Sequence, residues 1–394
     1  MKYFYHFLAF SLVSLLFSCN SSTEENIGFQ EIKITESDII SFEEVVNEIE
    51  FIPFVIPEDT PLKLSANDPH LEIDNKIYFS VGDFRDASIH VFELNGKYEQ
   101  TFKKQGDGPE EYPYINGIDM IDDKLAIWDQ RGTFKLYNKT NFDFEGVKKL
   151  AGVDIDFIPF YQSLGDGKWI LVDDYSGEVD EESYYPVFQL LDEKTEEIKT
   201  FSPKARVITS NIIEGQIAEM PDKSYILNYG ASDTIYHYKN DSLRPWIKLN
   251  LADNNAPENE KLDPENFFEN IFANQTYSFN VGTALAANDI LKVGIFGIKK
   301  STNLNQDDLN TFPIQHLYIQ YPSLEYKVTK AFGAFGGKGY TKDGFFYEVL
   351  FAENILAYLE SNYFGKYTAQ LEAAMENLED EEDPILLKYN VKVK

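Results

Sequence analysis

The chain has 394 residues, an aromatic content of 15% and a formal net charge of −31. Its length suffices for a large buried core, and its aromatic content excludes a disordered acidic chain. The surplus of acids excludes the basic surface by which proteins bind nucleic acids or anionic lipid headgroups, so we expect no nucleic-acid partner. The single cysteine excludes an internal disulfide framework and a cysteine-rich zinc site.

The N-terminus has the features of a lipoprotein signal. Lys2 precedes an apolar run over residues 7–17, which is too short to span a bilayer but is typical of a secretory signal. The run ends in Leu15-Leu16-Phe17-Ser18-Cys19, which resembles a bacterial lipobox. We therefore expect residues 1–18 to be a signal peptide and Cys19 to carry the lipid that anchors the protein in a membrane. An ordinary signal peptide with an incidental cysteine is the alternative.

The residues after the cysteine predict a flexible tether, assigned to residues 19–43. Its first part, residues 20–26, is polar and acidic and contains no order-promoting side chains. A cysteine followed by Ser, Thr and two acids also resembles the export signal of surface-displayed Bacteroidetes lipoproteins. The expected location is therefore the outer membrane, exposed at the cell surface, with a periplasm-facing protein as the alternative.

A repeated pattern predicts the fold. An acidic or Asn turn precedes an apolar strand, and the copies follow one another at roughly 40–65 residues, as in the blades of a propeller. Hairpin signals such as Asn95-Gly96 supply further strands within each copy. We predict an all-β, six-bladed β-propeller of four-stranded blades as a single domain over residues 44–394. The six turn residues are Asp74, Asp123, Asp166, Asp222, Asn288 and Asp343.

The sixth copy is incomplete at its C-terminal end, where little chain follows the strand at residues 385–390. An unassigned strand at residues 49–54 lies before the first copy. We expect this N-terminal strand to pair beside the last C-terminal strand, because closing the ring removes an open sheet edge. Short helical insertions are predicted near residues 263–273, after the helix-start signal Asp263-Pro264, and near residues 366–380.

One turn carries a family resemblance. The stretch from Lys104 to Tyr112 resembles the G-x-G-P-G-E-Y turn of the six-bladed β-propeller lipoproteins of Bacteroidetes, which are related in architecture to NHL-repeat propellers. The resemblance implies the fold and an anchored location, and it implies no established reaction. Glycines allow positive φ and proline fixes the exit, so we expect a structural turn with its tyrosine packed between sheets rather than a ligand site. Its residues are Gly106, Gly108, Pro109, Glu111 and Tyr112.

The search for chemistry assigns no catalytic residue. His90, His237 and His316 share one position in the third strand of their copies, for which packing is favoured over a metal-binding ring. The chain contains no HExxH zinc motif, phosphate loop or G-x-S-x-G nucleophile turn. We therefore predict no metal site and no cofactor.

A ligand-binding or protein-interaction module is the favoured function, with a glycan or an envelope protein as the ligand. Its site would lie at one end of the central channel, where loops converge. The alternative is a propeller enzyme, a glycan hydrolase or lyase, that uses channel carboxylates with or without a metal ion. Channel carboxylates of raised pKa would favour that alternative. A structural role in an outer-membrane complex is a third possibility. The aromatic residues that could stack on sugars, although packing between blades is favoured, are Trp128, Trp169, Trp246, Tyr184 and Tyr185.

Overall fold

The structure is a computed structural model of the chain. It describes residues 29–57, 70–81, 86–129, 133–150, 160–172, 185–201, 204–205, 217–251, 255–257, 277–298, 314–331, 339–378, 380 and 383–394.

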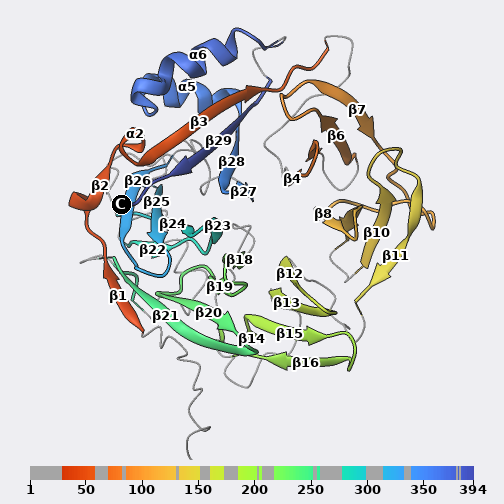
Figure 1. The fold of residues 1–394 in the computed structure, drawn as a ribbon, viewed down its shortest axis with the longest axis horizontal. Coiled ribbons are helices and arrows are strands. Elements are labelled where there is room, and N and C mark those ends of the chain that lie inside the picture. Colours follow the sequence, from red (N-terminus) through yellow and green to blue (C-terminus); the bar gives the residue numbers. More distant parts are fainter. Residues whose placement is uncertain are drawn as a thin grey trace, which may run out of the picture.

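Six sheets in the described residues form a ring around a central axis (Figure 1). The first strand of each blade lies innermost, and first strands contact one another between blades one and two, four and five, five and six, and six and one. The predicted six-bladed β-propeller is therefore confirmed. Blades one to three are β4 (His70–Ile73), β5 (Ile77–Val81), β6 (Ser88–Phe92) and β7 (Tyr98–Phe102); β8 (Gly117–Ile121), β9 (Lys124–Trp128), β10 (Thr133–Asn138) and β11 (Phe144–Lys149); and β12 (Phe160–Gly165), β13 (Lys168–Val172), β15 (Phe188–Asp192) and β16 (Glu197–Thr200).

Blades four to six follow the same order, and a small sheet pairs β14 (Tyr185–Pro186) with β17 (Lys204–Ala205). In blade five the inner position is shared by two short strands, both of which pair with the next strand. The blades are β18 (Ile217–Glu219), β19 (Tyr225–Leu227), β20 (Thr234–Lys239) and β21 (Ser242–Asn250); β22 (Phe279–Asn280), β23 (Leu285–Ala287), β24 (Ile290–Phe296), β25 (Ile314–Gln320) and β26 (Tyr326–Lys330); and β27 (Gly339–Lys342), β28 (Phe345–Leu350), β29 (Ile385–Val391) and β3 (Val46–Pro53).

The repeated turn joins the first strand of each blade to the second. Positive φ values occur at the predicted turn residues of several blades, such as 61° at Asp123, 53° at Asn288 and 49° at Asp343. Asp and Asn tolerate this left-handed conformation because their short polar side chains bond locally. The sequence pattern therefore identified the hairpin that lies nearest to the axis in each blade.

The ring closes where the two ends of the domain meet. Strand β3 pairs antiparallel with β29, with Ile52 opposite Leu386, and Phe54 N donates a hydrogen bond to the Pro384 carbonyl at 3.1 Å. The predicted closure by the N-terminal strand is confirmed. Because the two strands come from opposite ends of the chain, no hairpin turn joins them.

Residues 30–55 form a belt around the outer rim, which we call the N-terminal belt. Its strand β1 (Gln30–Lys33) runs parallel to β21 of blade four, and β2 (Ile39–Ile40) runs parallel to β26 of blade five (Figure 1). Val55 then bridges to Lys97 of blade one. This arrangement corrects the tether expected over residues 19–43, because buried Ile32 and Ile34 fix the chain to the ring from residue 30 onward. Residues 19–28 lie outside the described residues.

Short helices lie outside the ring. Helix α2 (Phe42–Val45) follows the 3-10 turn η1 (Glu36–Asp38), and blade six carries α5 (Ala352–Glu360), the 3-10 turn η6 (Gly365–Tyr367) and α6 (Thr368–Met375) on its outer side (Figure 1). Helix α6 corresponds to the insertion predicted near residues 366–380, and α5 was not predicted. The insertion predicted near residues 263–273 lies outside the described residues. Within the described part of the chain, no helix is long and apolar enough to cross a membrane.

Aromatic side chains fill the space between blades. Trp128, Trp169 and Trp246 are each 1% exposed, and the Trp169 indole donates to Glu193 Oε2 at 2.8 Å. The three tryptophans therefore pack between sheets rather than line an open surface. Tyr184 and the side chain of Tyr185 lie outside the described residues.

Candidate functional site at the central axis

Four polar side chains meet on the inner strands of four consecutive blades. We call Tyr340 of blade six, Glu72 of blade one, Asp119 of blade two and Tyr161 of blade three the axial cluster. Glu72 lies on the opposite face of β4 from Leu71 and Ile73, because successive side chains of a strand point to opposite faces. Because these strands lie next to the central axis, their inward-facing polar side chains come close to those of neighbouring blades.

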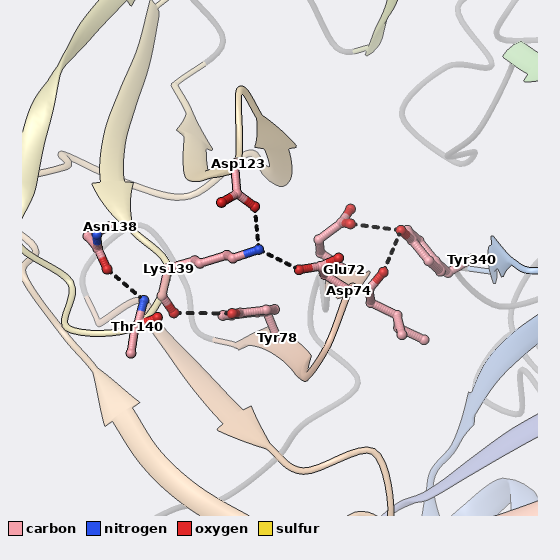
Figure 2. Close-up of polar contacts among 9 residues, drawn as sticks. Glu72, Asp74, Tyr78, Asp123, Asn138, Lys139, Thr140 and Tyr340 are labelled. Atoms are coloured by element: carbon pink, nitrogen blue, oxygen red, sulfur yellow. Dashed lines mark hydrogen bonds and ion pairs between the residues drawn. The ribbon is translucent and has the colours of Figure 1, made fainter.

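Each carboxyl group in the axial cluster receives a tyrosine hydroxyl from a neighbouring blade. Tyr340 Oη lies 2.7 Å from Glu72 Oε1 and 3.2 Å from the Ile73 carbonyl, so its one proton is shared between two acceptors (Figure 2). Asp119 accepts the Tyr161 hydroxyl and the backbone N–H of Met120, the latter at 2.6 Å. These hydrogen bonds therefore link blade six to blade one and blade two to blade three, and the charge of Asp119 acts on Glu72 between the two pairs.

Burial sets the charge of the axial cluster. Glu72 is 7% exposed, and burial raises its pKa to about 8; the nearby Asp119 charge adds to this rise, while the Tyr340 hydrogen bond and Lys342 oppose it. Burial also raises the pKa of Asp119 to about 6, against the hydrogen bonds from Met120 and Tyr161. At neutral pH Glu72 is therefore mostly protonated and can donate a hydrogen bond, whereas Asp119 is mostly ionised.

A second acid close by is in the opposite state. Asp74 lies in the turn that follows β4, and Lys139 Nζ of blade two contacts it at 2.8 Å and also contacts Asp123 (Figure 2). The hydrogen bond from Lys139 lowers the pKa of Asp74. The Tyr78 hydroxyl of blade one donates to the Lys139 carbonyl at 3.1 Å. This hydrogen bond fixes the turn of blade two that carries Lys139 against blade one. Two residues apart on the chain, Glu72 is kept neutral and Asp74 is kept charged.

The turn from Lys104 to Tyr112, which carries the family resemblance, lies between blades one and two, away from the axial cluster. Tyr112 is fully buried, its ring packs on Phe102, which also contacts Tyr137 of blade two, and its hydroxyl donates to the Ala87 carbonyl at 2.9 Å. Gly108 N donates to Glu111 Oε2 at 2.9 Å, and a Cβ at Gly106 would lie 2.0 Å from that same oxygen. The Pro109 carbonyl accepts a hydrogen bond from Lys135 Nζ at 2.8 Å. The motif therefore acts as a packed turn in this geometry, and Cys19 lies outside the described residues.

The three repeated histidines lie in third strands, away from the axis. His90 bonds to Ser88 Oγ at 2.9 Å and to Thr101 Oγ1 at 2.8 Å, and burial lowers its pKa to about 4. His237 packs on Trp246, and His316 packs on Tyr318. These contacts lie within the blade that carries each histidine, so the three side chains have separate partners in three different blades. No group of three or more metal-binding side chains occurs in the part of the chain that the structure describes.

Comparison with known proteins agrees with this architecture. Residues 19–285 match the DUF5128 family, described as "6-bladed beta-propeller". The chain belongs to this family. A protein of Bacteroides fragilis, described as a presumed exported protein, has a similar structure with a TM-score of 0.60 at 14% identity, covering 92% of this chain and 99% of that one. A member of the DUF4221 family from Bacteroides vulgatus has a TM-score of 0.53 at 14% identity, covering 89% and 98%.

These likenesses establish a shared fold and leave the ligand of this family member open. No functionally curated protein matches the chain. Lipidation and the likeness to NHL-repeat propellers stay predictions.

Sequence reasoning did not single out any residue of the axial cluster. Relative to the repeated turn residue of its blade, Glu72 lies two positions earlier, Tyr340 three and Asp119 four. The spacing is not constant, so no repeat position identifies the cluster in this DUF5128 propeller. Only Asp119 offered a local signal, as the one charged residue among the apolar residues of β8. His70, two positions before Glu72 on β4, shares its face of the strand.

Proposed function

We propose that this protein is a binding module of the cell envelope and that its ligand contacts the axial cluster. The convergence of two carboxyl groups and two tyrosine hydroxyls from four blades carries the proposal. Protonated carboxyl and phenol groups both donate and accept hydrogen bonds, as the hydroxyl and amide groups of a glycan or a protein segment require. Ligand sites commonly combine a few such polar groups with an apolar scaffold.

Charge narrows the class of ligand. The charges of Asp119 and Asp74 raise the pKa of Glu72 and that of Lys342 lowers it, and the only cation paired with one of these acids is Lys139, on Asp74, among the described residues. An anionic group placed beside these acids would be repelled. The cluster therefore suits a neutral glycan or an uncharged protein segment better than a phosphate or a uronic acid.

The envelope location rests on the N-terminal sequence. The DUF5128 match begins at Cys19, the residue expected to carry the lipid, and one protein of similar fold is described as presumed exported. We propose an outer-membrane lipoprotein exposed at the cell surface. The anchor would lie only eleven residues before β1, so the ring would be held close to the membrane.

Acid–base catalysis is the second candidate, because burial raises the pKa of Glu72 to about 8 and that of Asp119 to about 6. A protonated acid beside a carboxylate of lower pKa is the pair that glycan hydrolysis requires. In this candidate Glu72 would be the proton donor and Asp119 the base or nucleophile.

A glycan array with residues 27–394 tests both candidates. We expect selective glycan binding that weakens by about tenfold or more in Tyr340→Phe, because the hydroxyl that orients Glu72 is lost. Tyr98→Phe is the matched control, since that hydroxyl bonds to Thr101 Oγ1 on the outer strand of blade one. Product formed from the bound glycan, and lost in Glu72→Gln, would favour the enzyme. Binding that both Tyr340→Phe and Glu72→Gln leave unchanged would contradict a role for the axial cluster.

A further inference from the structure

Side chains from one kind of turn bridge neighbouring blades around most of the ring. The turn between the third and fourth strands of a blade reaches back to the preceding blade. The bridging pairs are Lys139 Nζ with Asp74 Oδ2 at 2.8 Å, Glu193 Oε2 with Lys148 Nζ at 3.7 Å, Asp241 Oδ2 with Lys168 Nζ at 3.0 Å, and Tyr321 Oη with Asp222 Oδ2 at 2.9 Å.

Blade six cannot make this bridge to blade five. Its third and fourth strands, β29 and β3, come from opposite ends of the domain, so no turn exists between them. Asn47 and residues 391–394 lie at the place of the turn. They leave a pocket of about 330 Å³ against the inner turn of blade five, which we call the closure pocket. The pocket is thus a direct consequence of how the ring is closed.

The closure pocket has a polar rim and an apolar floor. Ala287, Ile290 and Phe346 are buried hydrophobic residues on its floor. The rim carries four side-chain amides and one carboxylate, which belong to Asn47, Asn288, Gln320, Asn390 and Asp289. A side-chain amide carries an NH₂ donor and an oxygen acceptor, and a hydroxyl group of a sugar can pair with either one.

Two of the rim amides are already oriented. Asn390 Oδ1 accepts hydrogen bonds from Asn47 Nδ2 at 3.2 Å and from Glu48 N at 3.1 Å, which fixes the amide plane. Gln320 Nε2 contacts the Asp289 carboxylate, which fixes the second amide. Preorganised polar groups lower the entropy cost of binding.

The charges at the pocket balance in a way that favours a neutral ligand. Asp289 is negative, whereas Lys392 and Lys394 are positive, and Lys394 Nζ lies 3.5 Å from Glu325. The volume lies at the small end of ligand pockets, which run from about 300 to 1,000 Å³. We propose that the closure pocket is a second binding site, separate from the axial cluster, for a neutral carbohydrate of one or two rings.

Calorimetric titration of residues 27–394 with neutral mono- and disaccharides tests the proposal. Asn47→Trp blocks the pocket from its exposed edge, and Gln320→Leu removes the oriented rim amide without adding bulk. The matched control is Asn75→Trp, which places the same ring on the exposed inner turn of blade one, outside the pocket. We expect one or more sugars to bind, with affinity reduced about tenfold or more by either pocket variant and changed less than about twofold by the control.

Three outcomes would overturn the proposal: no sugar binds at millimolar concentration, binding persists in both pocket variants, or binding is lost in Glu72→Gln instead. The last result would place the sugar at the axial cluster and would leave the proposed function intact. Melting temperatures establish whether each variant is folded. If Asn47→Trp does not fold, the affinity of Gln320→Leu alone tests the closure pocket. The closure pocket shares no residue with the axial cluster. The sugar titration therefore stays a valid test even if no ligand binds at the axial cluster.

Discussion

Two buried glutamates of this propeller have opposite protonation behaviour because only one has a cation. Glu348 is 8% exposed, and burial acts to raise its pKa, but Lys292 Nζ at 2.6 Å, together with His316 and the Tyr389 hydroxyl, outweighs burial and holds the pKa below its usual value. Glu72 is similarly buried, its hydrogen-bond donor is the neutral Tyr340, and its pKa rises to about 8. The partner, rather than the depth of burial, therefore decides the charge.

Glu72 makes stability depend on pH. Its pKa is about 8 in the folded protein against 4.5 for an unperturbed glutamate, so between these limits the folded state binds more protons than the unfolded state. The free energy of unfolding should therefore fall as pH rises from 5 to 8, by up to a few kcal/mol. Urea unfolding of Glu72→Gln should show a smaller fall across this range. Glu372→Gln, an exposed change on α6, should keep the wild-type slope, and equal slopes in all three proteins would contradict the prediction.

The ion pair between blades five and six should be costly to break on one side only. Lys292→Met keeps the packing of the side-chain stem but leaves Glu348 buried without its cation. We expect a loss of about 3–5 kcal/mol in the free energy of unfolding. The double variant Lys292→Met/Glu348→Leu should recover most of that loss, because an apolar pair replaces the ion pair. Urea titration measures both, and a single variant as stable as the wild type would refute the argument.

At the scale of elements, the N-terminal belt depends on the ring for its structure. Strands β1 and β2 have four and two residues, too few to persist without tertiary packing. Ile34 is fully buried, and its N–H donates to the Asn250 carbonyl at 2.8 Å. The belt is thus attached to blade four through a few apolar side chains and a short parallel ladder.

Ile34→Ala should loosen the belt at blade four. A buried isoleucine replaced by alanine costs about 2–5 kcal/mol when the whole domain unfolds with it. If β1 detaches by itself, the global cost is smaller and the amides of residues 30–33 exchange faster instead. Hydrogen exchange together with thermal melting distinguishes these results, with the exposed Lys33→Ala as the control. Unchanged exchange and an unchanged melting temperature would show that Ile34 does not hold the belt.

Short-range sequence patterns predicted the strands and turns. The features that were not predicted depend on contacts between residues far apart in the sequence. The hairpin turns at Asp123 and Asn288 could be predicted, because turn conformation depends on local residue type. The pairing of β1 with β21 could not, since the sequence around Ile32 is equally compatible with a solvated segment. The axial cluster was missed for a related reason: Glu72 becomes buried only when the inner strands of other blades surround it.

At the scale of the whole molecule, ring closure concentrates the longest-range contacts in one blade. Asn47 and Asn390 are 343 residues apart and still form a side-chain hydrogen bond. If β3 is an integral strand of blade six, its amides within residues 49–53 that bond to β29 should be as protected from exchange as the amides of β7, the outermost strand of blade one, that bond to β6. Native-state hydrogen exchange measures this. Rapid exchange over residues 49–53 alone would mean that the ring opens at this strand.

Closure by the two ends of the domain also sets the order in which the molecule can be completed. At about 5–20 residues per second, the partner of β3 is synthesised roughly 20–70 s after β3 itself. During that interval Phe51 and Ile52, buried in the finished blade, have no strand of their own blade to pair with. The ring therefore cannot close until nearly the whole chain has been synthesised, and if the protein is exported, as we propose, the chain would cross the membrane before its ring is closed.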